Sequence, residues 1–428
     1  METEVTTNPK RLLGAATALG LTLAISACAE EGGGKDDSAT GDGVAYGAPL
    51  EDWKAAFADV DPITVNAQSS APEGSPVGKM YEDYFKEVEE WSDGKITFEI
   101  AFSNAVAETL EVDDALRDGR LDMGNVLYVY EADQYPFNAA LGDASFIGDQ
   151  APAINPLQLH GAMNQIALES DQFASELEEQ GLVPILPWFS GDANGIECSE
   201  ARSSMADFKG VQTVAAGRVN SLELKALSAA PVSMPYTELF EALQRGTVDC
   251  SLNSMRVASL MGLIDISPNF TIDETVGLSK TPGGWLVSKN FWDELPLVAQ
   301  QLLFDKSRTI LDVNITGSTQ FQVDGLAAIQ EAGGTVSPFS NDAREALEGA
   351  HAEALDAMAA DSKIEDGAAL VSELESKTDE WASKVRDLGF DGEVGFADFS
   401  AWHEENGFDL TEYLDTLYDD VVSKHRPS

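Results

Sequence analysis

The sequence predicts an α/β protein with two lobes, a cleft between them and one long helix that braces both lobes. Short apolar runs alternate along the chain with amphipathic stretches of helical period, which is typical of largely parallel sheets covered by helices. The alternation ends and begins again near residue 211, so it forms two series. Together these series exceed the roughly 250–300 residues that one hydrophobic core usually organises, so we expect two lobes.

The first lobe is predicted to comprise residues 51–190 and 280–330. Its strands are short apolar runs, and its helices place apolar residues three or four positions apart. In chain order, we expect a strand at 63–68, a helix at 77–91, a strand at 95–101, a helix at 109–118, a strand at 121–127, a helix at about 156–180 and a strand at 182–189. Residues 297–330 are almost continuously compatible with a helix, and we expect them to form the bracing helix.

The second lobe is predicted to comprise residues 191–279 and 331–385, and residues 386–428 are predicted to form a helical extension. We expect a strand at 211–215, a helix at 221–228, an extended segment at 231–235, a helix at 238–245, a strand from 248, helices after 341 and 367, and a terminal helix at 410–422. Gly and Pro cluster near 188–195 and 274–286, where the chain is expected to cross between the lobes. Carboxyl ends of strands point into such a cleft, so we expect it to close around a ligand.

Residues 1–27 are predicted to be a signal peptide. Lys10 and Arg11 form a positive segment, and no further charge precedes Cys28; the apolar run is too short to span a membrane comfortably. The Ile-Ser-Ala before Cys28 resembles the bacterial lipobox, in which the Cys receives lipid. An apolar helix that ends in a Cys by chance is the alternative. Residues 28–50 are rich in Gly, Asp and Ser, which predicts a flexible tether between lipid and folded body.

The chain is strongly acidic, with 74 Asp and Glu against 26 Lys and Arg and a formal net charge of -48. A surface of this charge repels nucleic acid and anionic lipid, so we expect neither as a partner. Of the three Cys residues, Cys198 and Cys250 remain if Cys28 carries lipid. In a compartment that permits disulfides these two can form a bridge, and two buried thiols are the alternative.

Few residues suit catalysis. The four histidines, His160, His351, His403 and His425, lie in predicted helices or near the C-terminus. The sequence contains no nucleophile elbow, no Gly-rich phosphate loop and no His or Cys motif that binds a metal. Carboxylates are so numerous that no catalytic pair stands out, and a solvated surface explains them. We therefore expect no enzymatic activity, no cofactor and no metal site.

Binding of an organic solute requires a few placed polar groups and flat aromatic walls. Such residues lie at or near predicted strand ends, namely Asn66, Gln68, Asn125, Tyr128, Trp188, Asn194, Tyr236, Asn253 and Trp285. For the aromatic residues a place in the core is the alternative, and for the amides a place on the surface or in a turn. Their shared position at strand ends makes them candidates for ligand contact.

Several segments form a recognisable pattern. They are Phe85-x-x-Val88-Glu89 with Asp93-Gly94-Lys95-Ile96, Leu116-Arg117-Asp118-Gly119-Arg120-Leu121-Asp122-Met123-Gly124, Phe208-Lys209-Gly210-Val211, Ala230-Pro231-Val232-x-Met234, Glu238-Leu239-Phe240-x-Ala242-Leu243-Gln244-Arg245-Gly246-Thr247-Val248-Asp249, and Trp285-Leu286-Val287-Ser288-Lys289-x-x-Trp292-Asp293-x-Leu295-Pro296. From about Ile63 to Val385, the chain resembles the periplasmic binding subunits of TRAP transporters, the DctP-like family. The run that ends at Asp249 is the most specific, and its helix-to-strand turn at Gly246 requires a residue without a side chain.

This resemblance implies a periplasmic-binding-protein-like fold and uptake driven by an ion gradient, in which the chain delivers its ligand to integral membrane subunits of a TRAP transporter. It also implies an organic acid as ligand, with contacts at Asn253, Tyr236 and near Trp285. Family members typically bind the carboxylate through an Arg in the strand that follows the Lys-Gly turn, but residues 211–215 contain no Arg. A second Arg, common in the preceding strand, is replaced near Asn194.

Two other arginines could supply a guanidinium, whose planar fork gives a carboxylate two charged hydrogen bonds. Arg218 lies a few residues past the expected position, and Arg256 follows Asn253. Exposure on the surface is the alternative for each, and a ligand that is not a simple carboxylate is another.

We therefore predict an extracytoplasmic solute-binding lipoprotein, anchored to the cell membrane through Cys28, that captures a small organic solute, an organic acid by family habit. It would deliver this solute to a TRAP-type transporter for uptake. The alternatives are a binding lipoprotein of an ABC transporter, a surface-anchored enzyme and a purely structural lipoprotein.

Overall fold

The computed structural model describes residues 43–234, 236–390 and 392–428, which all belong to one compact unit of the chain. The predicted signal peptide, the predicted lipidation at Cys28 and most of the predicted tether lie outside the described residues. Among the residues that are described, no helix is both long and apolar enough to cross a membrane.

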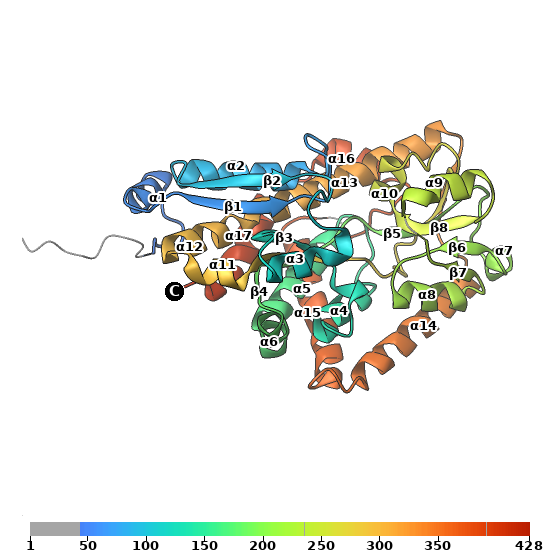
Figure 1. The fold of residues 1–428 in the computed structure, drawn as a ribbon. Coiled ribbons are helices and arrows are strands. Elements are labelled where there is room, and N and C mark those ends of the chain that lie inside the picture. The colour runs from blue at the N-terminus through green and yellow to red at the C-terminus, as the bar shows by residue number, and fades with distance from the viewer. Residues whose placement is uncertain (1–42, 235, 391) are drawn as a thin grey trace, which may run out of the picture. The chain divides into compact units, whose positions relative to one another are not determined.

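The first sheet has five strands in the order β2-β1-β3-β10-β4 (Figure 1). Its strands are β1 (Ile63–Gln68), β2 (Ile96–Ala101), β3 (Met123–Val126), β4 (Leu182–Phe189) and β10 (Gly283–Ser288). Strand β1 is parallel to β2 and β3, whereas β10 is antiparallel to both of its neighbours. The predicted strands of this region are present within a few residues of their expected ends.

The second sheet has six strands in the order β11-β9-β5-β8-β6-β7. Its strands are β5 (Asn194–Cys198), β6 (Gln212–Val214), β7 (Ala230–Val232), β8 (Cys250–Ser254), β9 (Asn269–Thr271) and β11 (Thr335–Ser337). All of them run in one direction except β5, which is antiparallel to β8 and β9. The predicted largely parallel pairing is therefore present in both sheets, with one reversed strand in each.

The two reversed strands, β5 and β10, are the first strands that the chain forms after it passes from one sheet to the other. Residues 190–193 connect β4 to β5, and residues 272–282 connect β9 to β10. A chain that leaves one sheet at the carboxyl ends of its strands reaches the facing edge of the other sheet, and the strand that begins there must run backwards. We call these connections the first and the second crossing; they fall where Gly and Pro cluster in the sequence.

Helices that precede the first crossing pack on the first sheet. They are α1 (Leu50–Phe57), α2 (Lys79–Trp91), η1 (Thr109–Glu111), α3 (Val112–Arg117), η2 (Tyr128–Tyr130), α4 (Pro136–Asp143), α5 (Asn155–Glu169) and α6 (Asp171–Glu179). The single helix expected at 156–180 is in fact two. Ser170 is extended, and its side chain accepts a hydrogen bond from Phe173 N at 3.1 Å, so it ends α5 and caps α6.

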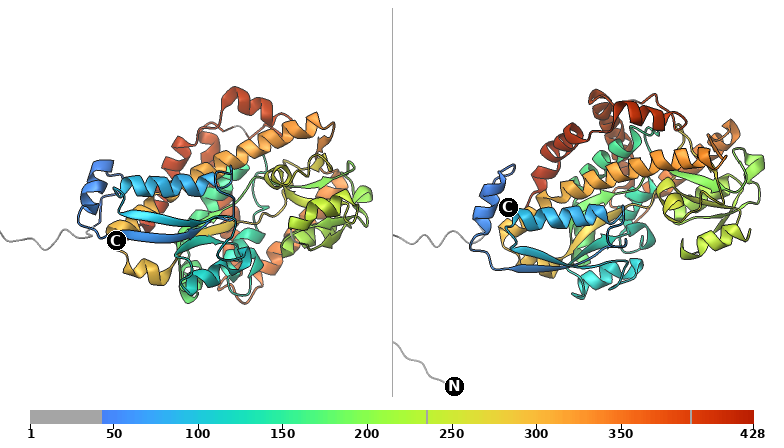
Figure 2. Two further views of the ribbon diagram at one scale, coloured as in Figure 1. Left: turned by 45° about the horizontal axis from the view of Figure 1, so that its top comes forward. Right: turned by 90° about the horizontal axis from the view of Figure 1, so that it is seen from above.

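Short helices and one side of the bracing helix pack on the second sheet. The short helices are α7 (Met205–Phe208), α8 (Arg218–Ala226), α9 (Tyr236–Gln244) and α10 (Met255–Leu260). After β10 come α11 (Lys289–Glu294), α12 (Leu297–Asp305) and α13 (Ser307–Glu331). Helix α13 packs against α2 and β4 on one side and against α10 and β11 on the other, so it braces both sheets (Figure 2).

The bracing helix is not continuous from 297 to 330, because α12 ends at Asp305 and α13 begins at Ser307. At the junction, the Lys306 ammonium pairs with Glu87 at 2.8 Å and lies 3.0 Å from the ring centroid of Trp91. Both partners come from α2 or its end. The sequence of the helix alone does not contain these contacts.

The last helices are α14 (Asn341–Ala359), α15 (Gly367–Asp387), α16 (Phe399–Asn406), α17 (Thr411–Asp420) and η3 (Val422–His425). Helix α15, which the predicted division places with the second lobe, packs along α5, and Trp381 Nε1 donates to Gln165 Oε1 at 2.9 Å. Tyr413 Oη of α17 donates to Leu157 O at 2.8 Å. Helix α17 thus packs on a helix of the first sheet, whereas α16 packs on α13 and its Phe399 shares a core cluster with Phe270 of β9; the lobe boundaries themselves stay predictions.

Candidate functional site

A small cavity of about 80 Å³ lies beside the two crossings. Its lining residues are Gly191, Asp192, Asn194, Ala216, Asn220, Leu252, Asn253, Ser254, Arg256, Val257, Lys280 and Thr281. They come from both crossings, from the facing ends of β5 and β8, and from the first turns of α8 and α10. The cavity is therefore built where the chain passes between the sheets, which is where open α/β sheets bind ligands.

Strand β8 and the helix that follows it, α10, carry two polar side chains of the cavity, Asn253 and Arg256. The strand ends at Ser254, whose side chain accepts a hydrogen bond from Val257 N at 3.4 Å and so begins α10. This places Asn253 at the end of the strand and Arg256 in the first turn of the helix. Gly195 lies opposite Asn253 in β5, and a Cβ there would come within 2.2 Å of the Phe270 ring. Only glycine permits that close pairing.

Lys280 brings an ammonium group into the cavity from the second crossing. The residue is 6% exposed, and its backbone N donates to Ser145 Oγ at 2.7 Å. The Nζ atom is buried and has no hydrogen-bond partner within the described part of the chain. Burial lowers the pKa of Lys280 to about 8, with Asp192 acting against this shift and Arg256 adding to it.

Asp192 brings a carboxylate from the first crossing. Its Oδ2 accepts a hydrogen bond from Arg256 N at 3.2 Å, whereas its buried Oδ1 has no partner among the residues described. Burial raises the pKa of Asp192, and the Arg256 guanidinium and a hydrogen bond from the Ser254 side chain oppose this shift. Arg256 itself donates from Nη1 to Ser318 Oγ of α13 at 3.5 Å. The bracing helix therefore contacts a side chain of the cavity.

The three asparagines of the cavity differ in which side-chain atoms form hydrogen bonds within the protein. Asn194 and Asn220 each donate from Nδ2 to Ser279 O, at 2.6 and 2.9 Å, and so hold the residue that precedes Lys280. Asn253 donates to Glu197 Oε2 at 3.1 Å and to Ser251 Oγ at 3.2 Å. Its Oδ1 is buried without a partner in the described structure. Asn253 thus offers an acceptor, while Asn194 and Asn220 position the second crossing.

The predicted amides of the first lobe do not line this cavity. Asn66 is exposed and donates from Nδ2 to Asp122 Oδ2 at 2.7 Å. Gln68 is buried and binds the backbone of residues 106–107 through both ends of its amide. Asn125 has a buried Oδ1 without a hydrogen-bond partner in the described ranges, 2.3 Å from where a Cβ of Gly283 would be.

The predicted aromatic residues of the first sheet lie in the core. Trp285 is fully buried, and its ring lies 4.7 Å from that of Tyr81. Trp188 contacts His160 edge to face at 5.0 Å. Tyr128 donates to Pro187 O at 3.5 Å. For these three the core, which the sequence left open as an alternative, is where the structure places them.

Arg218 and Tyr236 are the remaining predicted residues. Arg218, in the first turn of α8, forms an ion pair with Asp143 of α4 and lines a different cavity of about 310 Å³. Tyr236 begins α9, but its side chain lies outside the described structure. Of the predicted site residues, the structure therefore brings Asn194 and Asn253 together, and Arg256, the second arginine candidate, joins them.

Sequence reasoning missed Lys280 and Asp192. Each lies in a segment where Gly and Pro cluster and where a crossing is predicted, 274–286 and 188–195. A charged residue inside a predicted crossing is a usable signal, because both crossings border the cleft. Neither residue is an amide or an aromatic residue at a strand end, which is the pattern that the sequence analysis uses.

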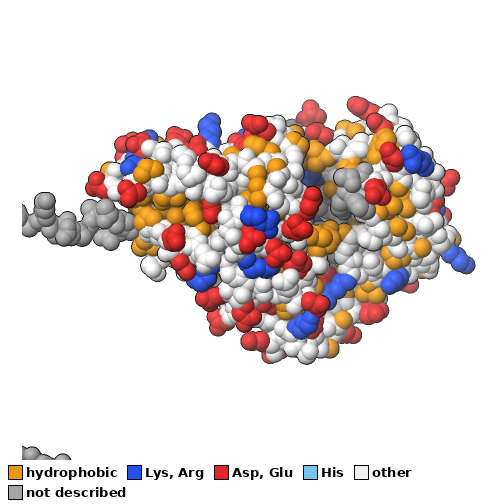
Figure 3. All heavy atoms as spheres, in the orientation of Figure 1, with side chains coloured by type: hydrophobic (Ala, Val, Ile, Leu, Met, Phe, Trp, Pro, Cys, Tyr) orange, Lys and Arg blue, Asp and Glu red, His pale blue; other side chains and the backbone are white. Residues whose placement is uncertain are grey.

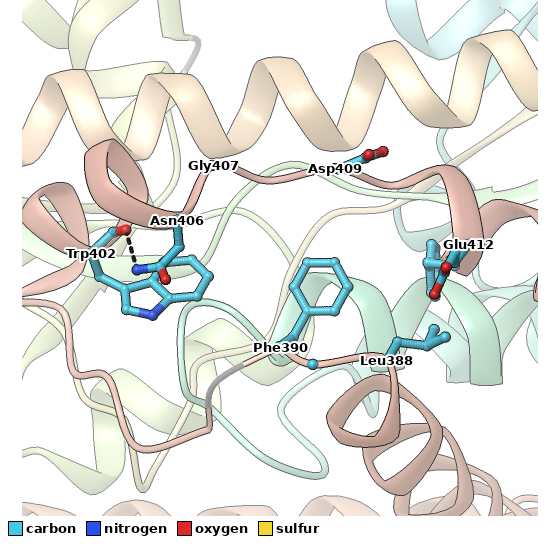
Figure 4. A pocket seen from close by; sticks show the side chains of 9 residues that line it. Leu388, Phe390, Trp402, Asn406, Gly407, Asp409 and Glu412 are labelled. Carbon is cyan, nitrogen blue, oxygen red and sulfur yellow. Dashed lines mark hydrogen bonds between the residues drawn. The ribbon is translucent and has the colours of Figure 1, made fainter.

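A larger cavity of about 570 Å³ lies among the C-terminal helices (Figure 4). Its lining residues are Leu388, Gly389, Phe390, Trp402, Asn406, Gly407, Asp409, Glu412 and Tyr413. The carboxylates of Asp409 and Glu412 are exposed, and no Lys or Arg is among these residues. The smaller cavity is the better candidate site, since it alone of the two holds buried charged atoms without partners.

Cys198 and Cys250 form a disulfide between β5 and β8. On the face drawn in Figure 3, Asp and Glu side chains are spread over the surface and far outnumber Lys and Arg. Within the described ranges, no group of three or more His, Cys, Asp and Glu side chains is arranged to hold a metal ion.

The model of the family described as bacterial extracellular solute-binding protein, family 7, or DctP, matches residues 67–362, which is more than half of the chain. The chain belongs to this family. The predicted DctP-like resemblance is thereby confirmed, and the match covers every strand of the two sheets except most of β1, together with the cavity beside the crossings. The family is one of extracellular solute-binding proteins and not of enzymes.

Curated relatives of this family member are distant. A solute-binding protein of Albidiferax ferrireducens is 23% identical over 301 residues, which are 67% of this chain and 83% of the relative. The C4-dicarboxylate-binding periplasmic protein DctP of Rhodobacter capsulatus is 23% identical over 242 residues, 55% of this chain and 68% of the relative.

Solved structures confirm the two-lobed α/β fold. A TRAP solute-binding protein from an unidentified marine microbe, specific for aromatic acid ligands, has a TM-score of 0.64 and 21% identity, with 74% of this chain and 99% of that one covered. The ectoine-binding protein of the TeaABC TRAP transporter of Halomonas elongata has a TM-score of 0.62 and 18% identity, with 74% and 99% covered. At these identities the likeness shows the fold, and the ligands named are those of the relatives.

Proposed function

We propose that this solute-binding protein captures a small organic anion outside the cytoplasmic membrane and delivers it to a TRAP-type transporter. The observation that carries the proposal is the pairing of two cations, Lys280 and Arg256, with a single carboxylate, Asp192, around one cavity. In a chain with a net charge of -48, this cavity has more positive than negative side chains among its described lining residues.

The buried charge explains why an anion would bind. An ammonium held away from water without a partner is costly, and the lowered pKa of Lys280 expresses this cost. A carboxylate in the cavity would give Lys280 the charged hydrogen bond that it lacks. Arg256 and Lys280 would then perform together the role that the resemblance gives to an Arg in the strand at 211–215.

Binding would be completed by closure of the lobes. Lys280 and Asp192 lie on the crossings, and Arg256 contacts α13, which packs on both sheets. A ligand that neutralises these groups would favour the arrangement in which they come together, since a ligand shifts an equilibrium toward the state it binds better.

The predicted partners and anchor are part of the same proposal. The family membership and the TRAP proteins among the solved relatives support delivery to integral membrane subunits of a TRAP transporter. The lipobox-like residues before Cys28 support a lipid anchor. A Cys28→Ser variant should be released into the soluble fraction of cells that retain the wild-type protein in their membranes, and equal retention of both would contradict the anchor.

Thermal unfolding tests the binding role. The chain from residue 43 onward contains the whole described unit and would be heated with organic acids, sugars, amino acids and aromatic compounds. A ligand at about 100 times its dissociation constant adds roughly 2.7 kcal/mol and shifts the midpoint by a few degrees. We expect stabilisation by organic acids and none by neutral sugars. Stabilisation by neutral compounds alone would contradict the proposal.

A further inference from the structure

We infer that the ligand is a short-chain hydroxymonocarboxylate, bound through its carboxylate by Lys280 and Arg256 and through its hydroxyl by the Asp192 carboxylate. This inference rests on the proposed binding function and narrows its ligand to one chemical class. It follows from three properties of the cavity: its charge, its unpaired atoms and its size.

The charges around the cavity favour one negative charge on the ligand. Lys280 and Arg256 are positive and Asp192 is negative, so the sum over the described lining residues is one positive charge. A monoanion neutralises this sum. A dicarboxylate would leave a buried negative charge, and a zwitterionic amino acid would leave a buried positive charge. Uncompensated buried charge is costly in either case.

The unpaired atoms require a donor on the ligand as well. Within the described residues, Lys280 Nζ is an unpaired donor, but Asp192 Oδ1 and Asn253 Oδ1 are unpaired acceptors of residues that line the same cavity. A bare carboxylate has no proton for them, and it would leave both acceptors buried and unsatisfied. A hydroxyl group close to the carboxylate supplies one proton without adding charge, and the Asp192 carboxylate is the stronger acceptor for it.

The size and the walls of the cavity favour a short aliphatic chain. The volume of about 80 Å³ is well below the roughly 300 Å³ at which drug-sized pockets begin. The apolar lining residues are Ala216, Leu252 and Val257, and none of the described lining residues is aromatic. The ligand therefore differs from the aromatic acids and from the C4-dicarboxylate named for two of the relatives.

Matched acids test the ligand class without any substitution. Calorimetry on the chain from residue 43 onward would compare lactate with propionate, glycolate with acetate, and lactate with malate and alanine. We expect each hydroxy acid to bind at least about tenfold more tightly than its deoxy counterpart, because a site built to bind a hydroxyl rejects the analogue that lacks it. Malate and alanine should bind more weakly than lactate.

Two substitutions test the assigned roles. Lys280→Gln should lower the affinity for lactate at least about tenfold, with partial rescue in Lys280→Arg. Asp192→Asn raises the net charge of the cavity by one, so the ratio of malate to lactate affinity should rise about tenfold. Substitution of a residue that only supports the fold would leave the ratio of malate to lactate affinity unchanged. Lys209→Gln, which removes an exposed lysine of the second lobe, should leave all affinities unchanged.

The outcomes separate this inference from the proposed function. Equal affinity for lactate and propionate, or tighter binding of malate than of lactate, would overturn the ligand class while acid binding itself stands. Unchanged lactate affinity in Lys280→Gln would overturn the role of Lys280. If no organic acid stabilises the protein or releases heat, the proposed function fails, and this inference fails with it.

Discussion

Asn253 of β8 donates a hydrogen bond from Nδ2 to Oε2 of Glu197 on the neighbouring strand β5, at 3.1 Å. Glu197 is fully buried, and burial raises its pKa to about 8 against the opposing effect of this hydrogen bond. A cavity residue thus lies in contact with a carboxyl group that is protonated at neutral pH.

Replacing Glu197 by Gln should make the protein more stable in alkaline solution. The pKa of Glu197 is higher in the folded than in the unfolded state, so its contribution to stability is complete below about pH 4.5 and is lost as the pH rises through 8. Glu197→Gln does not titrate and should exceed the wild type by a few kcal/mol at pH 9, as measured by denaturant unfolding. Parallel stability curves for the two proteins between pH 5 and 9 would contradict the raised pKa.

Ligand affinity should fall as the pH rises above about 8. Lys280 must be charged to bind an anion, and its pKa of about 8 reflects burial first, with Asp192 and Arg256 as the charged groups that face it. Calorimetry in the Glu197→Gln background isolates this titration. The dissociation constant should increase about tenfold for each pH unit above 8, while Lys280→Arg should show no such change. A flat profile in both proteins would contradict the assignment.

Acid should destabilise the protein through His160. Burial lowers its pKa to about 3, and its ring donates from Nδ1 to Pro156 O at 2.5 Å and accepts from Ser190 N at 3.2 Å. Below about pH 6.5 the imidazole binds a proton in the unfolded state but not in the folded state. The free energy of unfolding therefore falls by up to about 1.4 kcal/mol per pH unit between pH 6.5 and 3. His160→Gln, which does not titrate, should lose less stability over this range. An equally steep loss would show that other groups cause it.

Loss of the disulfide should weaken both fold and binding. Cys198 and Cys250 are directly opposed in the strand pair that carries Asn194 and Asn253, and they are 52 residues apart in sequence. The double variant Cys198→Ala, Cys250→Ala should lose about 2–4 kcal/mol in denaturant unfolding, because the unfolded chain is no longer constrained. It should no longer respond to reductant, whereas the wild type should. Equal stability of the oxidised and reduced wild type would contradict this prediction.

The ion pair of Arg218 and Asp143 should have a small effect on the affinity for the ligand and should not be required for binding. It joins α8 of the second sheet to α4 of the first, and the Arg218 side chain is 54% exposed. Asp143 is 8% exposed, but water reaches the Arg218 end, so screening keeps the worth of the pair to about 1 kcal/mol. Arg218→Gln should therefore lower ligand affinity by less than about fivefold in calorimetry, and Asp143→Asn by a similar amount. Loss of all acid binding in Arg218→Gln would instead identify Arg218 as the carboxylate anchor.

Much of the fold could be predicted because short-range patterns report directly on local structure. The strand expected at 63–68 is β1 without change, and the helix-to-strand turn at Gly246 is present, with φ at 66°. The break at Ser170 was missed, since helical periodicity continues through a serine whose side chain ends one helix and caps the next. The interruption at Lys306 was missed because its partners Glu87 and Trp91 are more than 200 residues away.

The candidate site was harder to predict because its chemistry depends on burial. Trp285 and Asn253 both lie near strand ends, yet Trp285 is packed against Tyr81 in the core while Asn253 lines the cavity. In the sequence Lys280 does not differ from any other lysine, whereas in the structure its ammonium is buried and has no partner among the residues described. Position along a strand does not say which face of the sheet a side chain meets or what covers it.

By itself, the sequence determined the two α/β series, the positions of the crossings, the family pattern and the acidic charge, since these depend on the order of residues along the chain. Only the tertiary structure decided that Lys280, Asp192, Arg256 and Asn253 share one cavity. These residues come from segments up to 88 positions apart, 192 to 280. The pKa values and unpaired atoms on which binding depends arise when both crossings bury their charges together, which no local pattern encodes.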